Sequence, residues 1–116
     1  MNIYIYLDDI RDDDTFFQHL SAFEGHQWDA ILCRSAEEAI WFLNYYNGHA
    51  NIIIDLDHDL GEGHEMDDEV VASGYDVCKH IVEHQIRLVG FHIHSMNPVG
   101  VMNMRQLLTR YGYCEL

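Results

Sequence analysis

Blocks of hydrophobic and polar residues follow one another along the chain and predict strands and helices in turn. Two nearly continuous apolar runs, at 2–8 and 51–56, have acidic residues at or directly after their carboxyl ends and predict strands that are buried on both faces. Shorter apolar runs at 30–33 and 88–94 predict two further strands. The tail at 112–116 could supply a final edge strand.

Apolar residues at helical spacing fill the segments between these strands. They predict a helix at 14–24, a second helix that Ser35 opens as its N-cap, and a third that begins around Ser73. Asn97 and Pro98 are typical of an N-cap and a first helical position, so they predict the start of a last helix.

This alternation predicts an α/β fold with a mainly parallel sheet and right-handed crossovers. The 116 residues suit one domain, and acidic residues after the first and third predicted strands are the layout of a receiver-like fold, so we expect a single receiver-like domain over 1–116. Its architecture would be a flavodoxin-type three-layer sandwich with a four- to five-stranded sheet. The strand order 2-1-3-4-5 of that fold places the carboxyl ends of the first and third strands side by side.

Acidic residues follow both of these strands. Asp8 and Asp9 come after the first, and Asp57 and Asp59 after the third. Carboxylates gathered in one crevice repel one another unless a proton or cation lies between them, so we expect a divalent cation that handles phosphate. Asp55 alternates onto the side of Asp57, which leaves two readings: a group behind the site, or a side chain facing solvent at a sheet edge.

Composition limits the partners. There are 20 acidic residues against 6 basic ones, a formal net charge of −14, which disfavours duplex nucleic acid and anionic membranes. No apolar stretch is long enough to span a membrane, and the first apolar run ends at Asp8 without a basic segment before it, unlike a secretory signal. Cys33 and Cys78 lie in apolar settings and are expected to be reduced core residues, which favours a cytoplasmic location.

Four motifs occur in order across nearly the whole chain. They are Leu-Asp-Asp-Ile-Arg at 7–11, Asp-Leu-Asp-His-Asp-Leu-Gly at 55–61, Ser-Gly-Tyr-Asp at 73–76 and His-Ser-Met-Asn-Pro-Val-Gly at 94–100. Together they resemble the cyclic-phosphate-processing receiver-like family, small proteins related to response-regulator receivers. The resemblance implies a metal-dependent site that acts on a cyclic or terminal phosphate of a nucleotide.

The chain departs from an ordinary receiver in an informative way. It has the acidic pair after the first strand, Asp57 at about the phosphoacceptor position and Ser95 after the fourth strand, but it has no lysine after Lys79. A receiver uses such a lysine to grip the phosphoryl group, so hydrolysis is favoured over phosphoacceptor signalling. The added residues, which signalling receivers do not need, are His58, Asp59, His94 and Asn97.

We expect Asp8, Asp9 and Asp57 to bind Mg²⁺ or Mn²⁺ through oxygen. A further ligand from His58 or His94 would favour Mn²⁺ or another transition metal. Whether Asp57 or Asp59 touches the metal stays open.

Proton transfer and phosphate binding are assigned to neighbouring groups. His94 is the better general acid or base, because imidazole titrates near neutrality. The predicted proton-transfer residues are His94, Asp59 and His58. Ser95 and Asn97, at the start of the last helix, would bind phosphate oxygens, and Arg11 would offset phosphate charge.

Two functions follow from the sequence. The first is a metal-dependent phosphoesterase that acts on a cyclic or terminal phosphate of a nucleotide or RNA end. The second is a non-catalytic receiver-like module that is phosphorylated on Asp57 or sequesters a nucleotide. The expected partner is a small phosphorylated or cyclic nucleotide ligand; the sequence does not set the oligomeric state.

Overall fold

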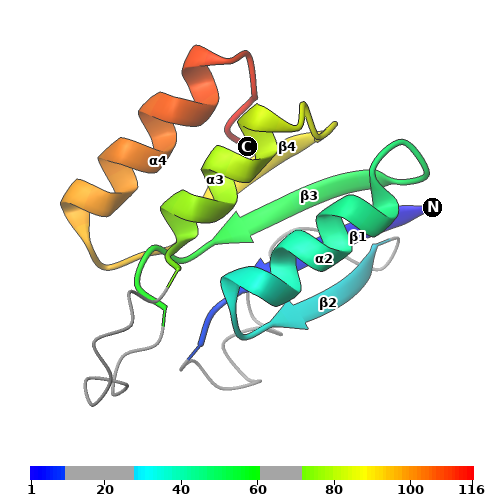
Figure 1. Ribbon diagram of the computed structural model, residues 1–116, viewed down its shortest axis with the longest axis horizontal. Coiled ribbons are helices and arrows are strands. Elements are labelled where there is room, and N and C mark those ends of the chain that lie inside the picture. The colour runs from blue at the N-terminus through cyan, green and yellow to red at the C-terminus, as the bar shows by residue number, and fades with distance from the viewer. Residues whose placement is uncertain (10–27, 61–71) are drawn as a thin grey trace.

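The computed structural model describes residues 1–9, 28–60 and 72–116, and its four strands form one parallel sheet (Figure 1). The strands are β1 (Asn2–Leu7), β2 (Asp29–Cys33), β3 (Asn51–Leu56) and β4 (Gly90–Ile93). Their order is β2-β1-β3-β4, so β1 and β3 are central and adjacent, as the receiver-like fold requires. The predicted α/β fold class and strand order are therefore confirmed.

Three helices belong to the described part of the chain. They are α2 (Ala36–Tyr46), α3 (Gly74–Glu83) and α4 (Pro98–Arg110), and α3 packs between the other two (Figure 1). The Ser35 hydroxyl accepts a bond from the Glu38 amide at 3.2 Å, and the Asn97 side chain accepts one from the Gly100 amide at 3.0 Å. These bonds confirm the two predicted N-caps. Within the described residues, no helix combines the length and apolar character needed to cross a bilayer.

The sheet separates two apolar clusters. On one face, alternate residues of the central strands, such as Ile5 and Ile54, pack with buried residues of all three helices. On the other face, Tyr4, Tyr6 and Ile53 form a smaller cluster. Both faces of β1 and β3 are therefore buried, which explains why these strands are almost continuously apolar in sequence.

Two predicted elements, the helix at 14–24 and the edge strand at 112–116, are not found as such among the described residues. The helix expected at 14–24 lies outside the described residues. The tail forms only an isolated parallel bridge between Glu115 and Phe91. The Phe91 amide donates to the Cys114 carbonyl, and the Phe91 carbonyl accepts from the Leu116 amide, each at 2.9 Å. The tail thus extends the sheet beside β4 without becoming a full strand.

The three cysteines should differ sharply in reactivity. Cys33 and Cys78 are fully buried, whereas Cys114 is exposed. Burial, and to a lesser degree Glu38, raises the pKa of Cys33 to about 12, which disfavours its reactive thiolate. We expect a thiol reagent to label one cysteine in the native protein and three after denaturation, with Cys114→Ser abolishing the native reaction. Native labelling of two or more thiols would contradict this burial.

Candidate metal and phosphate site

Three predicted site residues meet at the carboxyl edge of the sheet. Asp8, Asp57 and His94 directly follow β1, β3 and β4, and their amides donate to carbonyls of neighbouring chain segments at 3.0 to 3.1 Å. The strand hydrogen bonding therefore continues one residue beyond each element and fixes these positions. One ligand atom from each of the three side chains lies within 4.8 Å of the others.

Asp55 and Tyr6 fix the position of the His94 ring. Its Nδ1–H donates to Asp55 Oδ1 at 2.5 Å, and the Tyr4 hydroxyl donates to Asp55 Oδ2 at 2.5 Å. The Tyr6 ring stacks on the imidazole with 4.6 Å between centroids and 3° between planes. Asp55 is only 1% exposed, so of its two readings the buried group behind the site is correct.

This support directs the other ring nitrogen toward the carboxylates. His94 Nε2 lies 3.1 Å from Asp8 Oδ2. A carboxylate such as Asp55 can only accept a hydrogen bond, which places a proton on Nδ1. Such a carboxylate behind a histidine is the usual arrangement around metal-bound imidazoles, where it fixes the ring and its tautomer.

The electrostatics fit a cation. Asp8 is fully buried. Burial first, and then the Asp8 carboxylate, raise the pKa of Asp57, an effect that His94 partly offsets. A cation beside Asp57 would favour the charged form of this carboxylate. Carboxylate oxygens suit Mg²⁺ or Mn²⁺, and an imidazole nitrogen shifts the preference toward Mn²⁺.

A second cluster adjoins the first at the start of α4. His58 Nδ1 lies 2.7 Å from Asp59 Oδ1, and the Asn97 side-chain amide donates to the same oxygen at 3.2 Å. The hydrogen bond from His58 chiefly lowers the pKa of Asp59, and Asn97 adds to this effect. Asp59 is therefore an ionised partner that orients His58.

The polar side chains at the start of α4 accept hydrogen bonds from nearby backbone amides. The Ser95 hydroxyl oxygen accepts a bond from the Asn97 amide at 3.1 Å, which leaves its proton to donate elsewhere. The His58 ring packs directly against Gly100, where any Cβ would overlap it. The close approach of α4 therefore depends on this glycine.

The structure thus brings most of the predicted residues to one edge of the sheet. Asp9 follows Asp8 and is half-buried, but it does not belong to the group of possible metal ligands formed by Asp8, Asp57 and His94. Arg11 lies outside the described residues. The sequence did not predict a role for Tyr4 in the site. Its alternation with Tyr6 and Asp8 was the available signal, but the same pattern is equally typical of a core residue.

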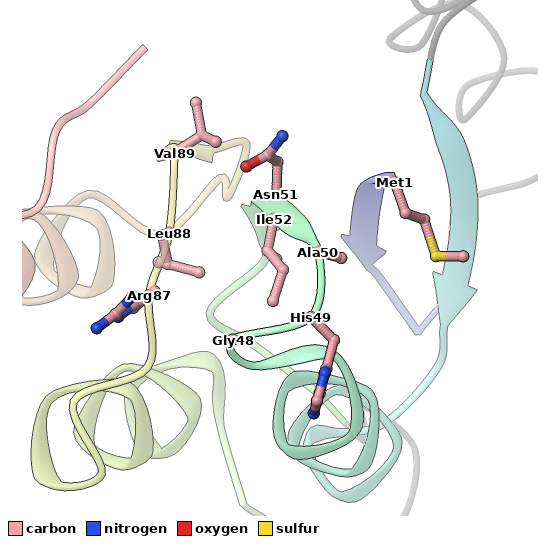
Figure 2. Close-up of a pocket in the computed structure, with 9 residues that line it drawn as sticks. All are labelled: Met1, Gly48, His49, Ala50, Asn51, Ile52, Arg87, Leu88 and Val89. Atoms are coloured by element: carbon pink, nitrogen blue, oxygen red, sulfur yellow. The ribbon is translucent and has the colours of Figure 1, made fainter.

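A separate hollow lies at the opposite edge of the sheet, beside the amino-terminal ends of β1 and β3 (Figure 2). Its volume is about 390 Å³. The described residues that line it are Met1, Gly48, His49, Ala50, Asn51, Ile52, Arg87, Leu88 and Val89. None of these carries a carboxylate, so this hollow does not share the chemistry of the acidic edge.

Comparison with known proteins agrees with this fold. The family described as "Cyclic-phosphate processing Receiver domain" matches residues 3–110, and the chain belongs to that family. A similar solved structure is the signal receiver domain assigned to a Luxo repressor protein of Vibrio parahaemolyticus. It has a TM-score of 0.64 and 17% identity, with 91% of this chain and 72% of that chain covered, a likeness of fold alone. No curated protein matches the chain.

Tyr4→Phe should destabilise the protein by about 1–3 kcal/mol, because Asp55 Oδ2 would lose a buried donor. Burial, and then the Asp55 charge, raise the pKa of Tyr4, so its hydroxyl remains a donor. Urea denaturation monitors the loss, and Tyr45→Phe on the exposed surface is the matched control. Equal stability of the two variants would show that the Tyr4–Asp55 bond is energetically unimportant.

Proposed function

We propose that this protein is a metal-dependent phosphoesterase that acts on a cyclic or terminal phosphate of a nucleotide or RNA end. The observation that carries the proposal is the convergence of Asp8, Asp57 and His94 from three strand ends. Membership of a cyclic-phosphate-processing family supports the phosphate chemistry.

In this proposal Asp8, Asp57 and His94 Nε2 hold Mg²⁺ or Mn²⁺. When bound, the cation polarises a phosphoryl oxygen and lowers the pKa of a coordinated water. It also offsets the formal charge of −14, which would otherwise repel an anionic ligand. Asp55 and Tyr4 keep the imidazole in the required tautomer and orientation.

The chain supplies proton transfer from the adjacent cluster. Asp59 accepts the Nδ1–H of His58, which leaves Nε2 of that ring to take or deliver a proton. This role falls to His58 rather than His94, whose Nε2 faces Asp8. Asp59 has the part of an orienting carboxylate behind a histidine base.

Substrate oxygens would meet donors at the start of α4. The Ser95 hydroxyl proton is the first of these. Asn97 already donates to Asp59 and caps α4, so it positions the cluster as well as facing the phosphate. Arg11 remains a proposed charge partner for the phosphate.

The test is hydrolysis of a panel of 3′,5′- and 2′,3′-cyclic nucleotides, and of RNA ending in a cyclic phosphate, with and without Mn²⁺ or Mg²⁺. We expect metal-dependent turnover that Asp57→Asn and His94→Ala abolish. Glu37→Gln, at an exposed acidic position in the first turn of α2, is the control and should retain full activity.

Other outcomes identify the alternative. Tight stoichiometric binding of a nucleotide without turnover would replace hydrolysis by sequestration. Stable labelling by acetyl phosphate that Asp57→Asn prevents would instead indicate a receiver, a result that the receiver-like fold makes worth measuring.

A further inference from the structure

Two histidines lie one turn apart near the end of α3, away from the acidic site. His80 and His84 have the i, i+4 spacing that places side chains on the same face of a helix, and their ring centroids are 4.2 Å apart. Gly74 lies at the other end of α3, and its backbone N–H donates a hydrogen bond to the His58 carbonyl beside the acidic site. At 1.5 Å per residue, the pair lies about 9 to 15 Å further along the helix axis.

A hydrogen bond to α2 orients the first ring. His80 Nε2 lies 2.7 Å from Asn44 Oδ1, and an amide oxygen accepts, so Nε2–H is the donor. Nδ1 of His80 then carries a lone pair. A metal-ligating histidine characteristically donates its second ring N–H to an oxygen in this way.

The surroundings favour a cation over an anion. His84 is the C-cap of α3, where the helix dipole presents partial negative charge. Glu83 lies between the two histidines in sequence and is exposed. Burial first, and then His84, lower the pKa of His80, which favours the neutral ring that metal coordination requires.

We propose that His80 and His84 form a chelating site for Zn²⁺ that is separate from the carboxylate-rich site at the strand ends. Paired histidines at i, i+4 on one helix face are an established zinc-binding arrangement. They would fill two of the four positions of tetrahedral Zn²⁺, with water in the others. By joining the last two turns of α3, the ion would stabilise that end of the helix.

Titration calorimetry of the full chain tests the site. An Asp57→Asn background removes one ligand of the acidic site, and excess Mg²⁺, which binds poorly to imidazole, occupies the remaining carboxylates. We expect Zn²⁺ uptake that His80→Gln and His84→Gln each weaken by at least about tenfold. His49→Gln, which removes an exposed histidine elsewhere, is the control and should leave the affinity unchanged.

Thermal unfolding supplies a second measurement. Saturating Zn²⁺ should raise the unfolding midpoint of the Asp57→Asn protein, and the increase should vanish in the added His84→Gln variant. His84 is exposed, so this variant should keep the unfolding midpoint of its parent without metal. Zinc affinity that is insensitive to both histidines, or sensitive to only one of them, would overturn the chelate.

Discussion

Asp55→Asn should lower turnover by about 10- to 100-fold and should weaken Mn²⁺ binding by a similar factor, the usual effect of changing a group that orients a metal-bound histidine. Asp55 would touch neither the cation nor the substrate, so these effects would act entirely through His94.

The reason lies in the two acceptor oxygens of Asp55. They receive the Tyr4 hydroxyl and the His94 Nδ1–H. Asparagine keeps one acceptor and introduces a donor. If its oxygen stays with Tyr4, its NH₂ group faces Nδ1, which must then accept, and the imidazole proton moves to Nε2. A protonated Nε2 cannot bind a cation.

Calorimetry with Mn²⁺ and steady-state kinetics measure these effects, and a double variant tests their cause. Adding Tyr4→Phe removes the competing hydroxyl, so the Asn side chain can turn its oxygen toward His94. Metal affinity should then recover in part, although stability falls further. Unchanged affinity in Asp55→Asn, or a further loss of affinity in the double variant, would contradict the tautomer explanation.

Gly74→Ala should reduce the free energy of unfolding by about 3 kcal/mol, at the upper end of overpacking costs. A Cβ on Gly74 would overlap the carbonyl oxygen of Asp57 and would lie 3.1 Å from the Cα of His58. Both obstacles are backbone atoms, which cannot rotate away. The residues that must shift are those of the acidic site, so cation affinity should fall as well.

Two other glycines give the matched comparison. Gly48 and Gly112 have φ of +80° and +91°, with nothing within 4 Å of an added Cβ. Their alanine variants incur only left-handed backbone strain, about 1–2 kcal/mol. Urea denaturation of the three variants ranks them. If Gly74→Ala proved no more harmful than the other two, the close contact between α3 and the site loop would not be rigid.

The sequence predicted the parts of this site that depend on chain order. Apolar runs located β1 and β3, and the order of strands and helices made them neighbours, so the meeting of Asp8 and Asp57 could be expected. The cap residues Ser35 and Asn97 likewise act locally, through amides three residues later. Such features need only spacing and backbone geometry.

The parts that sequence could not provide depend on side-chain direction across the sheet. The sequence could not show which carboxylate each ring nitrogen of His94 meets, which the structure places as Asp55 at Nδ1 and Asp8 at Nε2. Tyr4 pairs in register with Ile53, yet its hydroxyl reaches Asp55, a diagonal contact that alternation alone does not specify. The tail does not form a full strand because its pairing with β4 is an isolated bridge at Phe91, the residue of β4 whose amide and carbonyl both bond to it.

The position of β1 between two partners has a consequence for ion uptake. Hydrogen bonds on both sides hold this strand, and the residue that follows it is held by the Cys33 carbonyl. The backbone that bears Asp8 is thus preorganised before any ion could bind. Binding of a cation would therefore carry little cost for ordering the chain. Addition of the cation should leave the amide spectrum of the central strands nearly unchanged.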